Sequence, residues 1–185
     1  MMKRILIEDN VVDLSTCSYG FPWKSDVPCF NFNVPQECVT AHDINNIDDR
    51  SEIETLVIGC NLNNYDFISD MINLKQLYIY KGDNVSSLDF VSKLLKLKQL
   101  YIVGSHISEL DALCVLAREK ERLFVNESNY HRKNDYVFEG ICIETDRDID
   151  DAHKVLDTGL FISELIINNK LINEYCRADE ASLRP

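Results

Sequence analysis

Lys75-Gln76-Leu77-Tyr78-Ile79-Tyr80 returns further along the chain as Lys98-Gln99-Leu100-Tyr101-Ile102-Val103, and a leucine precedes each copy. The same step, Leu-x-Ile or Leu-x-Val, occurs at Leu56-Val57-Ile58 and at Leu123-Phe124-Val125, so the anchors fall at positions 56, 77, 100 and 123. A two-residue step filled by β-branched side chains is typical of a strand, whereas a helix repeats about every 3.6 residues. These anchors therefore predict four short strands.

The stretches between the anchors carry a different period. Residues 88–95 and 110–116 place apolar side chains three and four residues apart, which is the spacing of helical turns. The sequence therefore predicts a unit of strand, turn and short helix that recurs at nearly constant intervals. We call the interval from Lys75 to Lys98 the repeat length.

This unit resembles the leucine-rich repeat, whose pattern is close to LxxLxLxxNxI followed by the apolar positions of a helix. One unit fills the pattern with Leu97, Leu100, Ile102 and Ile107, and has Ser105 where the family usually has Asn. A serine at this position can still donate one hydrogen bond to the turn backbone.

The turn position varies between the units. It holds Asn61 in the first unit and Gly82 in the second, which is one residue longer before Val85. Over residues 53–126 the chain is similar to short, irregular bacterial-type repeats of about 22 residues. The resemblance implies an α/β solenoid with a parallel sheet on its concave face, short helices on its convex face and irregular terminal caps.

Weaker repeats extend the expected solenoid in both directions. Ile141-Cys142-Ile143 and Leu165-Ile166-Ile167 repeat the apolar step at a similar interval, with a helical stretch at 149–160 between them. Upstream, Ile5-Leu6-Ile7 and Phe30-Asn31-Phe32 are candidate irregular repeats.

We therefore expect one domain over residues 1–185. Residues 1–52 form an irregular N-terminal cap, because Pro22, Pro28 and Pro35 cluster there with Trp23 and suit a central strand poorly. Clear repeats occupy 53–126, and 127–185 hold an insertion loop followed by divergent C-terminal repeats.

The composition limits the classes of function. The chain has 185 residues, 45% hydrophobic and 27% charged, and its 31 acidic and 19 basic side chains give a formal net charge of −12. Such acidity disfavours nucleic acids and anionic membranes, because binding their phosphates depends on Lys and Arg. No apolar run approaches the roughly 20 residues that span a bilayer, and no signal peptide is evident. We therefore expect a cytoplasmic protein.

Motifs for catalysis or metal binding are missing from the sequence. The seven cysteines form no CxxC pair, and no HExxH, GxSxG, GxGxxG or GxxxxGK stretch occurs. Residues 146–157 imitate a calcium loop, but Asp151 stands where such a loop needs glycine. We therefore expect reduced thiols, no metal, no cofactor and no catalytic residue.

The middle residues of the anchors form the candidate binding surface. Because side chains alternate along a strand, these residues point away from the core and align across the sheet. The outward column is apolar and aromatic where a solvated face is usually polar, which indicates a protein partner. Its members are Val57, Tyr78, Tyr101, Phe124, Cys142 and Ile166, and the partner-binding residues are expected to be Val57, Tyr78, Tyr80, Tyr101, Val103 and Phe124.

Two acidic clusters refine the expected partner. Residues 43–54 and 144–151 each carry five acidic side chains and one arginine. An acidic field accelerates encounter with a basic protein, although carboxylates also stabilise turns and helix starts without any partner.

Several functions remain open at this level. The first is a protein-binding module, and the second is an immunity or inhibitor protein that neutralises a basic toxin or nuclease. Self-association as a homodimer, sheet packing without a binding role, and an enzyme with an unrecognised site are further alternatives. If the assignment of faces is right, Leu100→Ala should cost about 2–5 kcal/mol of stability, and Tyr101→Ala much less.

Overall fold

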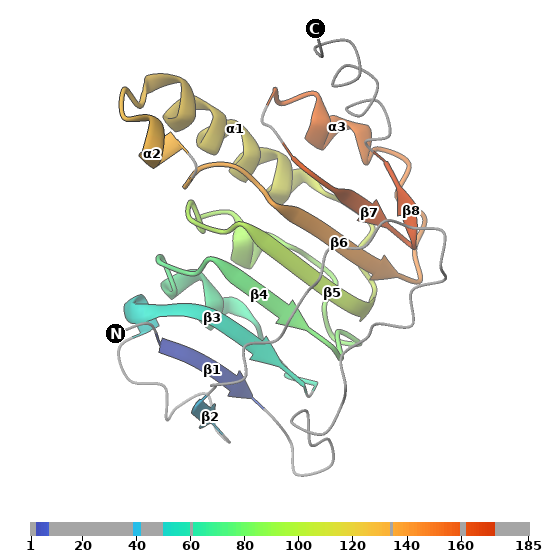
Figure 1. Cartoon of the computed structure of the whole chain (residues 1–185). Helices are drawn as coiled ribbons and strands as arrows, with labels where there is room; N and C mark the ends of the chain where they lie inside the picture. Colours follow the sequence, from blue (N-terminus) through green and yellow to red (C-terminus); the bar gives the residue numbers. More distant parts are fainter. Residues whose placement is uncertain are drawn as a thin grey trace, which may run out of the picture.

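A computed structural model describes residues 3–7, 39–41, 50–59, 61–133, 135–159 and 162–172. The fold is of the α/β class. Its strands form one eight-stranded sheet in the order β2-β1-β3-β4-β5-β6-β7-β8. All neighbouring strands are parallel except β7 and β8, and Figure 1 shows an open sheet that is not curled. The strands are β1 Lys3–Ile7, β2 Val39–Ala41, β3 Ile53–Ile58, β4 Gln76–Ile79, β5 Gln99–Ser105, β6 Gly140–Thr145, β7 Leu165–Ile167 and β8 Lys170–Leu171. The helices are η2 Arg50–Glu52, η3 Asp66–Asp70, η4 Asp89–Val91, α1 Asp111–Asn126, α2 Tyr130–Lys133 and α3 His153–Leu156.

The central strands align as the repeat predicts. Leu56 pairs with Leu77, and Leu77 with Leu100, so the anchor residues stand opposite one another. Ile141 and Leu165 continue the same row in β6 and β7. The strands expected at the first three anchors, at 141–143 and at 165–167 are therefore confirmed.

The hydrophobic core lies on one side of this sheet. The anchor row and the row two residues later, which includes Ile58, Ile79 and Ile102, belong to a single buried cluster. Residues of the turns and helices, such as Leu94 and Leu113, complete that cluster. The other face of the sheet is therefore turned away from the core.

Two successive turns repeat the same backbone hydrogen bonds. In both units a tight 3-10 turn links the preceding loop to the next strand, with amide-to-carbonyl distances between 2.8 and 3.0 Å. The bonds of η3 run from Ile68 to Tyr65, Met71 to Ile68 and Leu74 to Met71, and those of η4 run from Val91 to Leu88, Leu94 to Val91 and Leu97 to Leu94. Each bond in the second set follows its counterpart in the first by one repeat length.

The strand expected at 123–125 is wrong, because α1 runs through these residues. Residues 118–122 read Arg-Glu-Lys-Glu-Arg, all good helix formers. Arg122 also bonds Glu119 at 2.8 Å, one turn away. Lys120 occupies the repeat position that Leu97 holds before β5. The third unit therefore stays helical, and β6 takes the place beside β5.

The elements expected near the two ends of the sheet are only partly found in the structure. Residues 5–7 are a strand as expected, and lie in β1 between β2 and β3. The expected repeat at 30–32 and the proline cluster lie outside the described residues. Of the helical stretch expected at 149–160, the described part, 149–159, contains only the four-residue α3.

Candidate protein-binding face

The sheet face opposite the core carries the predicted column, and we call it the outer face. Val57 pairs with Tyr78, and Tyr78 with Tyr101. Cys142 and Ile166 continue the row in β6 and β7. All five side chains are absent from the core cluster, so the alternation of faces is confirmed.

The structure brings together five of the six predicted binding residues. Tyr80 and Val103 lie beyond the column on the same face, and the Tyr80 and Tyr101 ring centroids are 5.6 Å apart. Phe124 does not join them, because it belongs to α1, where the Lys133 ammonium lies 4.8 Å from its ring centroid. Cys142 occupies the place beside Tyr101 that Phe124 was expected to fill.

The outer column is not open to solvent. Its five side chains are between 0% and 3% exposed, so the chain itself covers them. Tyr80 and Val103 are only half-buried, and Glu144, at the carboxyl end of β6, is exposed. Gln76 and Glu139, where the strands start, are half-buried as well. The accessible parts of this face are therefore its two edges, and the edge where the strands end carries the accessible apolar side chains.

A chain of hydrogen-bonded side chains crosses the outer face near the starts of the strands, and we call it the polar ladder. Thr55 Oγ1 donates to Gln76 Oε1 at 2.9 Å, and Gln76 Nε2 donates to Gln99 Oε1 at 3.1 Å. Gln99 Nε2 then donates to a carboxylate oxygen of Glu139 at 2.8 Å. Every donor points toward the next strand, so the ladder fixes the orientation of both glutamine amides.

Tyr78 joins the polar ladder to the apolar column. Its hydroxyl donates to Gln99 Oε1 at 2.7 Å. Burial raises the pKa of this phenol well above its usual range, and the negative charge of Glu139 raises it further. Tyr78 therefore stays protonated and remains a hydrogen-bond donor throughout the neutral range.

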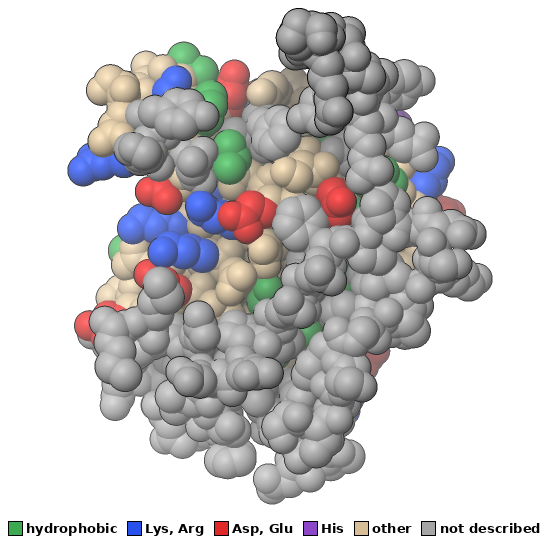
Figure 2. Space-filling model, in the orientation of Figure 1, with side chains coloured by type: hydrophobic (Ala, Val, Ile, Leu, Met, Phe, Trp, Pro, Cys, Tyr) green, Lys and Arg blue, Asp and Glu red, His purple; other side chains and the backbone are tan. Residues whose placement is uncertain are grey.

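Ion pairs flank the polar ladder. Lys75 Nζ lies 3.1 Å from Glu54, and Lys98 Nζ lies 3.8 Å from Glu139 and 4.0 Å from Asp135. Figure 2 shows basic and acidic side chains side by side over the starts of the central strands. This edge of the sheet is thus mixed in charge.

The opposite edge carries the second acidic cluster, residues 144–151, which we call the acidic loop. Glu144, Asp146, Asp148 and Asp150 line it, and all four are exposed. His106 Nδ1 lies 2.8 Å from Asp146 Oδ1, and this hydrogen bond lowers the pKa of the carboxyl group. The acidic loop is therefore a negatively charged border beside the accessible end of the outer face. The first acidic cluster falls largely outside the described residues.

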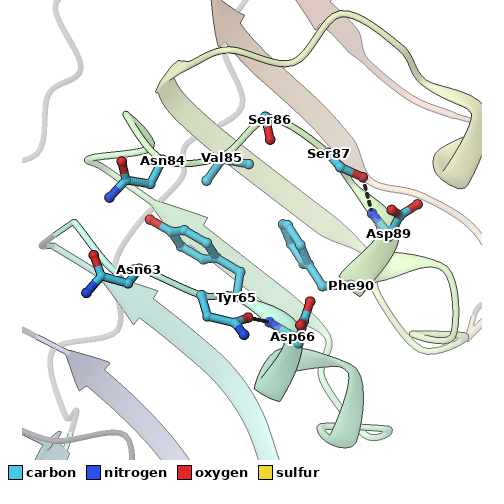
Figure 3. Close-up of a pocket in the computed structure, with 10 residues that line it drawn as sticks. Asn63, Tyr65, Asp66, Asn84, Val85, Ser86, Ser87, Asp89 and Phe90 are labelled. Atoms are coloured by element: carbon cyan, nitrogen blue, oxygen red, sulfur yellow. Dashed lines mark hydrogen bonds between the residues drawn. The ribbon is translucent and has the colours of Figure 1, made fainter.

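An open cavity of about 190 Å³ lies on another part of the molecule, between the turns that follow β3 and β4 (Figure 3). The Tyr65 and Phe90 rings stack in it with centroids 5.9 Å apart. Ser87 Oγ accepts a hydrogen bond from the Asp89 amide at 3.0 Å, which begins η4. The cavity is thus the seam between two repeated turns, and its polar groups help to build them.

Sequence reasoning missed the polar ladder, although the sequence contains a signal for it. The Lys-Gln pair recurs at 75–76 and 98–99, directly before each repeated strand. Identical residues at the same repeat position stand side by side in a parallel sheet, so adjacent glutamines can bond to each other. Glu139 cannot be found in this way, because α1 and α2 separate it from the repeat and no Lys-Gln pair marks its position.

Comparison with known proteins leaves the family open. No protein-family model matches the chain, and neither the curated proteins nor the solved structures contain a significant match. Within the described ranges, no helix has the length and apolar character needed to cross a membrane. Nor do three or more His, Cys, Asp or Glu side chains gather as a metal site in that part of the chain.

Proposed function

We propose that this chain is a solenoid of the leucine-rich-repeat type that binds a basic protein through its outer face. The observation that carries the proposal is the in-register column Val57-Tyr78-Tyr101-Cys142-Ile166, a second apolar row outside the core. Aromatic and aliphatic side chains at such positions supply most of the energy in many interfaces. The recurrence of the same turn hydrogen bonds after one repeat length supports the repeat assignment.

The edge of the outer face where the strands end gives the proposed route of binding. A partner meets Tyr80, Val103 and Glu144 first, because the column itself is covered in the free chain. The neighbouring acidic loop attracts a basic surface and repels an acidic one. Engagement of the column then requires the atoms that cover it to move, so binding is coupled to a local rearrangement.

The acidic loop also favours a second candidate, an inhibitor or immunity protein for a basic toxin or nuclease. This function requires a tight complex with one protein, whereas a scaffold binds several partners more weakly. Stoichiometry and the number of captured proteins therefore separate the two candidates.

The test compares two double variants of equal charge change. Glu144→Lys/Asp148→Lys alters the exposed border of the outer face, and Asp66→Lys/Asp89→Lys alters exposed acids on η3 and η4. Each folded variant is used to capture proteins from a native lysate. A basic partner that the wild type captures should be lost with the first pair and kept with the second. Purified components should then show weaker binding by at least tenfold, mostly through a slower association rate.

A third variant, Tyr80→Ala/Val103→Ala, tests the apolar part of the surface. We expect this variant to raise the dissociation rate of the same partner while keeping the salt dependence of association. Equal capture by the wild type and all folded variants would remove the outer face from the proposal.

A further inference from the structure

Lys120 is fully buried in the middle of an acidic protein. It lies on α1 with 0% of its surface exposed. Its amine donates to the backbone carbonyl oxygen of Leu95 at 2.9 Å and to that of Leu97 at 2.7 Å. The same nitrogen lies 4.6 Å from the centroid of the Phe138 ring. A lysine is almost never buried so completely without a specific set of partners.

The repeat explains where this amine is placed. Leu74 and Leu97 are buried at the ends of the two repeated turns, and Lys120 follows the second by one repeat length. Leu74 and Leu97 shortly precede strands, whereas the chain remains helical after Lys120. The Lys120 side chain therefore has a different environment from the two leucines. It reaches back to the preceding turn instead, and attaches α1 to the segment that leads into β5.

Two charged groups from other elements act on the amine. Lys98, directly before β5, disfavours the protonated form, and Asp135, which follows α2, favours it. Burial has the largest effect, and together these influences lower the pKa of Lys120 to about 7. Lys98 itself lies 4.0 Å from Asp135, so the two charges partly offset each other at this site.

We propose that Lys120 is a proton-controlled latch that holds α1 against the turn at residues 94–97. The carbonyl oxygens of Leu95 and Leu97 accept two N–H bonds of the amine in either protonation state. The added proton of the ammonium form finds the Phe138 ring but places a desolvated charge in the core. Protonation therefore weakens the docking of α1, while the neutral form keeps it closed.

The latch is independent of the proposed function, yet it adjoins the outer face. Release of α1 would also disturb the segment that carries Asp135 and Glu139. These carboxylates flank Lys98, and Glu139 ends the polar ladder. A change of pH near neutrality is therefore expected to loosen this edge of the sheet together with the helix.

Hydrogen–deuterium exchange tests the latch on the full chain. The opening equilibrium constant of residues 115–126 is obtained from the amide exchange rates after correction for intrinsic exchange. In the wild type this constant should be about tenfold larger at pH 6 than at pH 8. The reason is that the amine of the opened state binds a proton that the buried amine lacks. Lys120→Met removes the titrating group and should abolish this difference. The matched control is Lys154→Met on α3, which is exposed and should keep it. The same pH dependence in wild type and Lys120→Met would overturn the proposal.

A second measurement needs no variant. Carbon-13 NMR of the lysine ε-carbons in the wild type should show one resonance that titrates near pH 7. If every lysine titrated above about pH 9.5, the range of ordinary solvated amines, the latch would be excluded.

Discussion

The Tyr78 hydroxyl donates a hydrogen bond of 2.7 Å to Gln99 Oε1, and so ties the apolar column of β4 to the polar ladder of β5. The same oxygen accepts a second hydrogen bond, from Gln76 Nε2. Because a slip of one residue would turn every side chain to the other face, two donors converging on one acceptor help to fix the register of these strands.

Tyr78→Phe should therefore cost about 0.5–1.5 kcal/mol at pH 7, the usual net value of one hydrogen bond. Above pH 10 the effect should shrink. The folded chain holds this phenol protonated while the unfolded chain ionises it, so the wild type loses stability as the pH rises past 10. Urea unfolding at pH 7 to 11 measures both effects. Tyr136→Phe, at a half-buried site, is the control and should keep the alkaline loss; an unchanged alkaline slope in Tyr78→Phe would contradict the assignment.

Leu100→Ala and Tyr101→Ala should be similarly destabilising. Leu100 is 0% exposed in the core and Tyr101 is 3% exposed on the outer face. Truncation of either should cost about 2–5 kcal/mol, although the sequence alone predicts a much smaller loss for Tyr101. Chemical denaturation of both variants and of Val125→Ala, at a site 65% exposed, measures the comparison. A Tyr101→Ala loss as small as that of Val125→Ala would show that the outer column is loosely covered in solution.

Gly82→Ala should destabilise the chain by about 1–3 kcal/mol through overpacking. A Cβ atom at this position would lie 2.9 Å from the Val103 carbonyl oxygen and 3.2 Å from Ile102 Cγ2. That carbonyl cannot withdraw freely, because it accepts the Gly82 amide hydrogen at 2.9 Å. Thermal unfolding of Gly82→Ala and of Asp83→Ala, an exposed neighbour, separates the steric effect from local polarity. Equal melting temperatures for the two variants would contradict the close contact.

The loop between β7 and β8 offers a pair of variants with opposite expected results. Asn168 and Asn169 have φ of 48° and 63°, and such two-residue loops favour Asn-Gly. Asn169→Gly should be neutral or stabilise by a few tenths of a kcal/mol. Asn168→Gly should destabilise by about 1–3 kcal/mol, because Asn168 Oδ1 accepts the Thr145 amide hydrogen at 2.8 Å. Denaturant midpoints measure the stabilities of the two variants. A lower midpoint for Asn169→Gly than for Asn168→Gly would contradict these roles of the two asparagines.

Periodicity predicted the part of the fold that repeats. The anchors at Leu56, Leu77 and Leu100 and the column through Tyr78 and Tyr101 follow from identical or similar residues at a nearly constant spacing. Ser105 differs from the expectation: its hydroxyl donates to the Glu144 carbonyl oxygen at 2.9 Å, in the neighbouring strand β6, instead of to the turn backbone.

Periodicity failed where the third unit diverges. Leu123-Phe124-Val125 matches the anchor pattern, but the helix-forming residues around Lys120 outweigh the local strand preference. The cover of the outer column could not be predicted either. Apolar residues at alternating positions show that a sheet face is buried, and do not say whether the same chain or a partner buries it.

The antiparallel β8 changes what the sheet can do at one of its edges. A parallel sheet can be extended by further parallel strands. The unpaired backbone groups of an exposed, flat edge can therefore bind strands of other molecules. Here the last strand of the described residues is Lys170–Leu171, which reverses direction after a two-residue loop. An edge of two residues offers a foreign strand very few backbone hydrogen bonds, and Lys170 adds a charge that opposes its approach. The hairpin therefore protects this end of the sheet from intermolecular strand addition, the first step of β-aggregation.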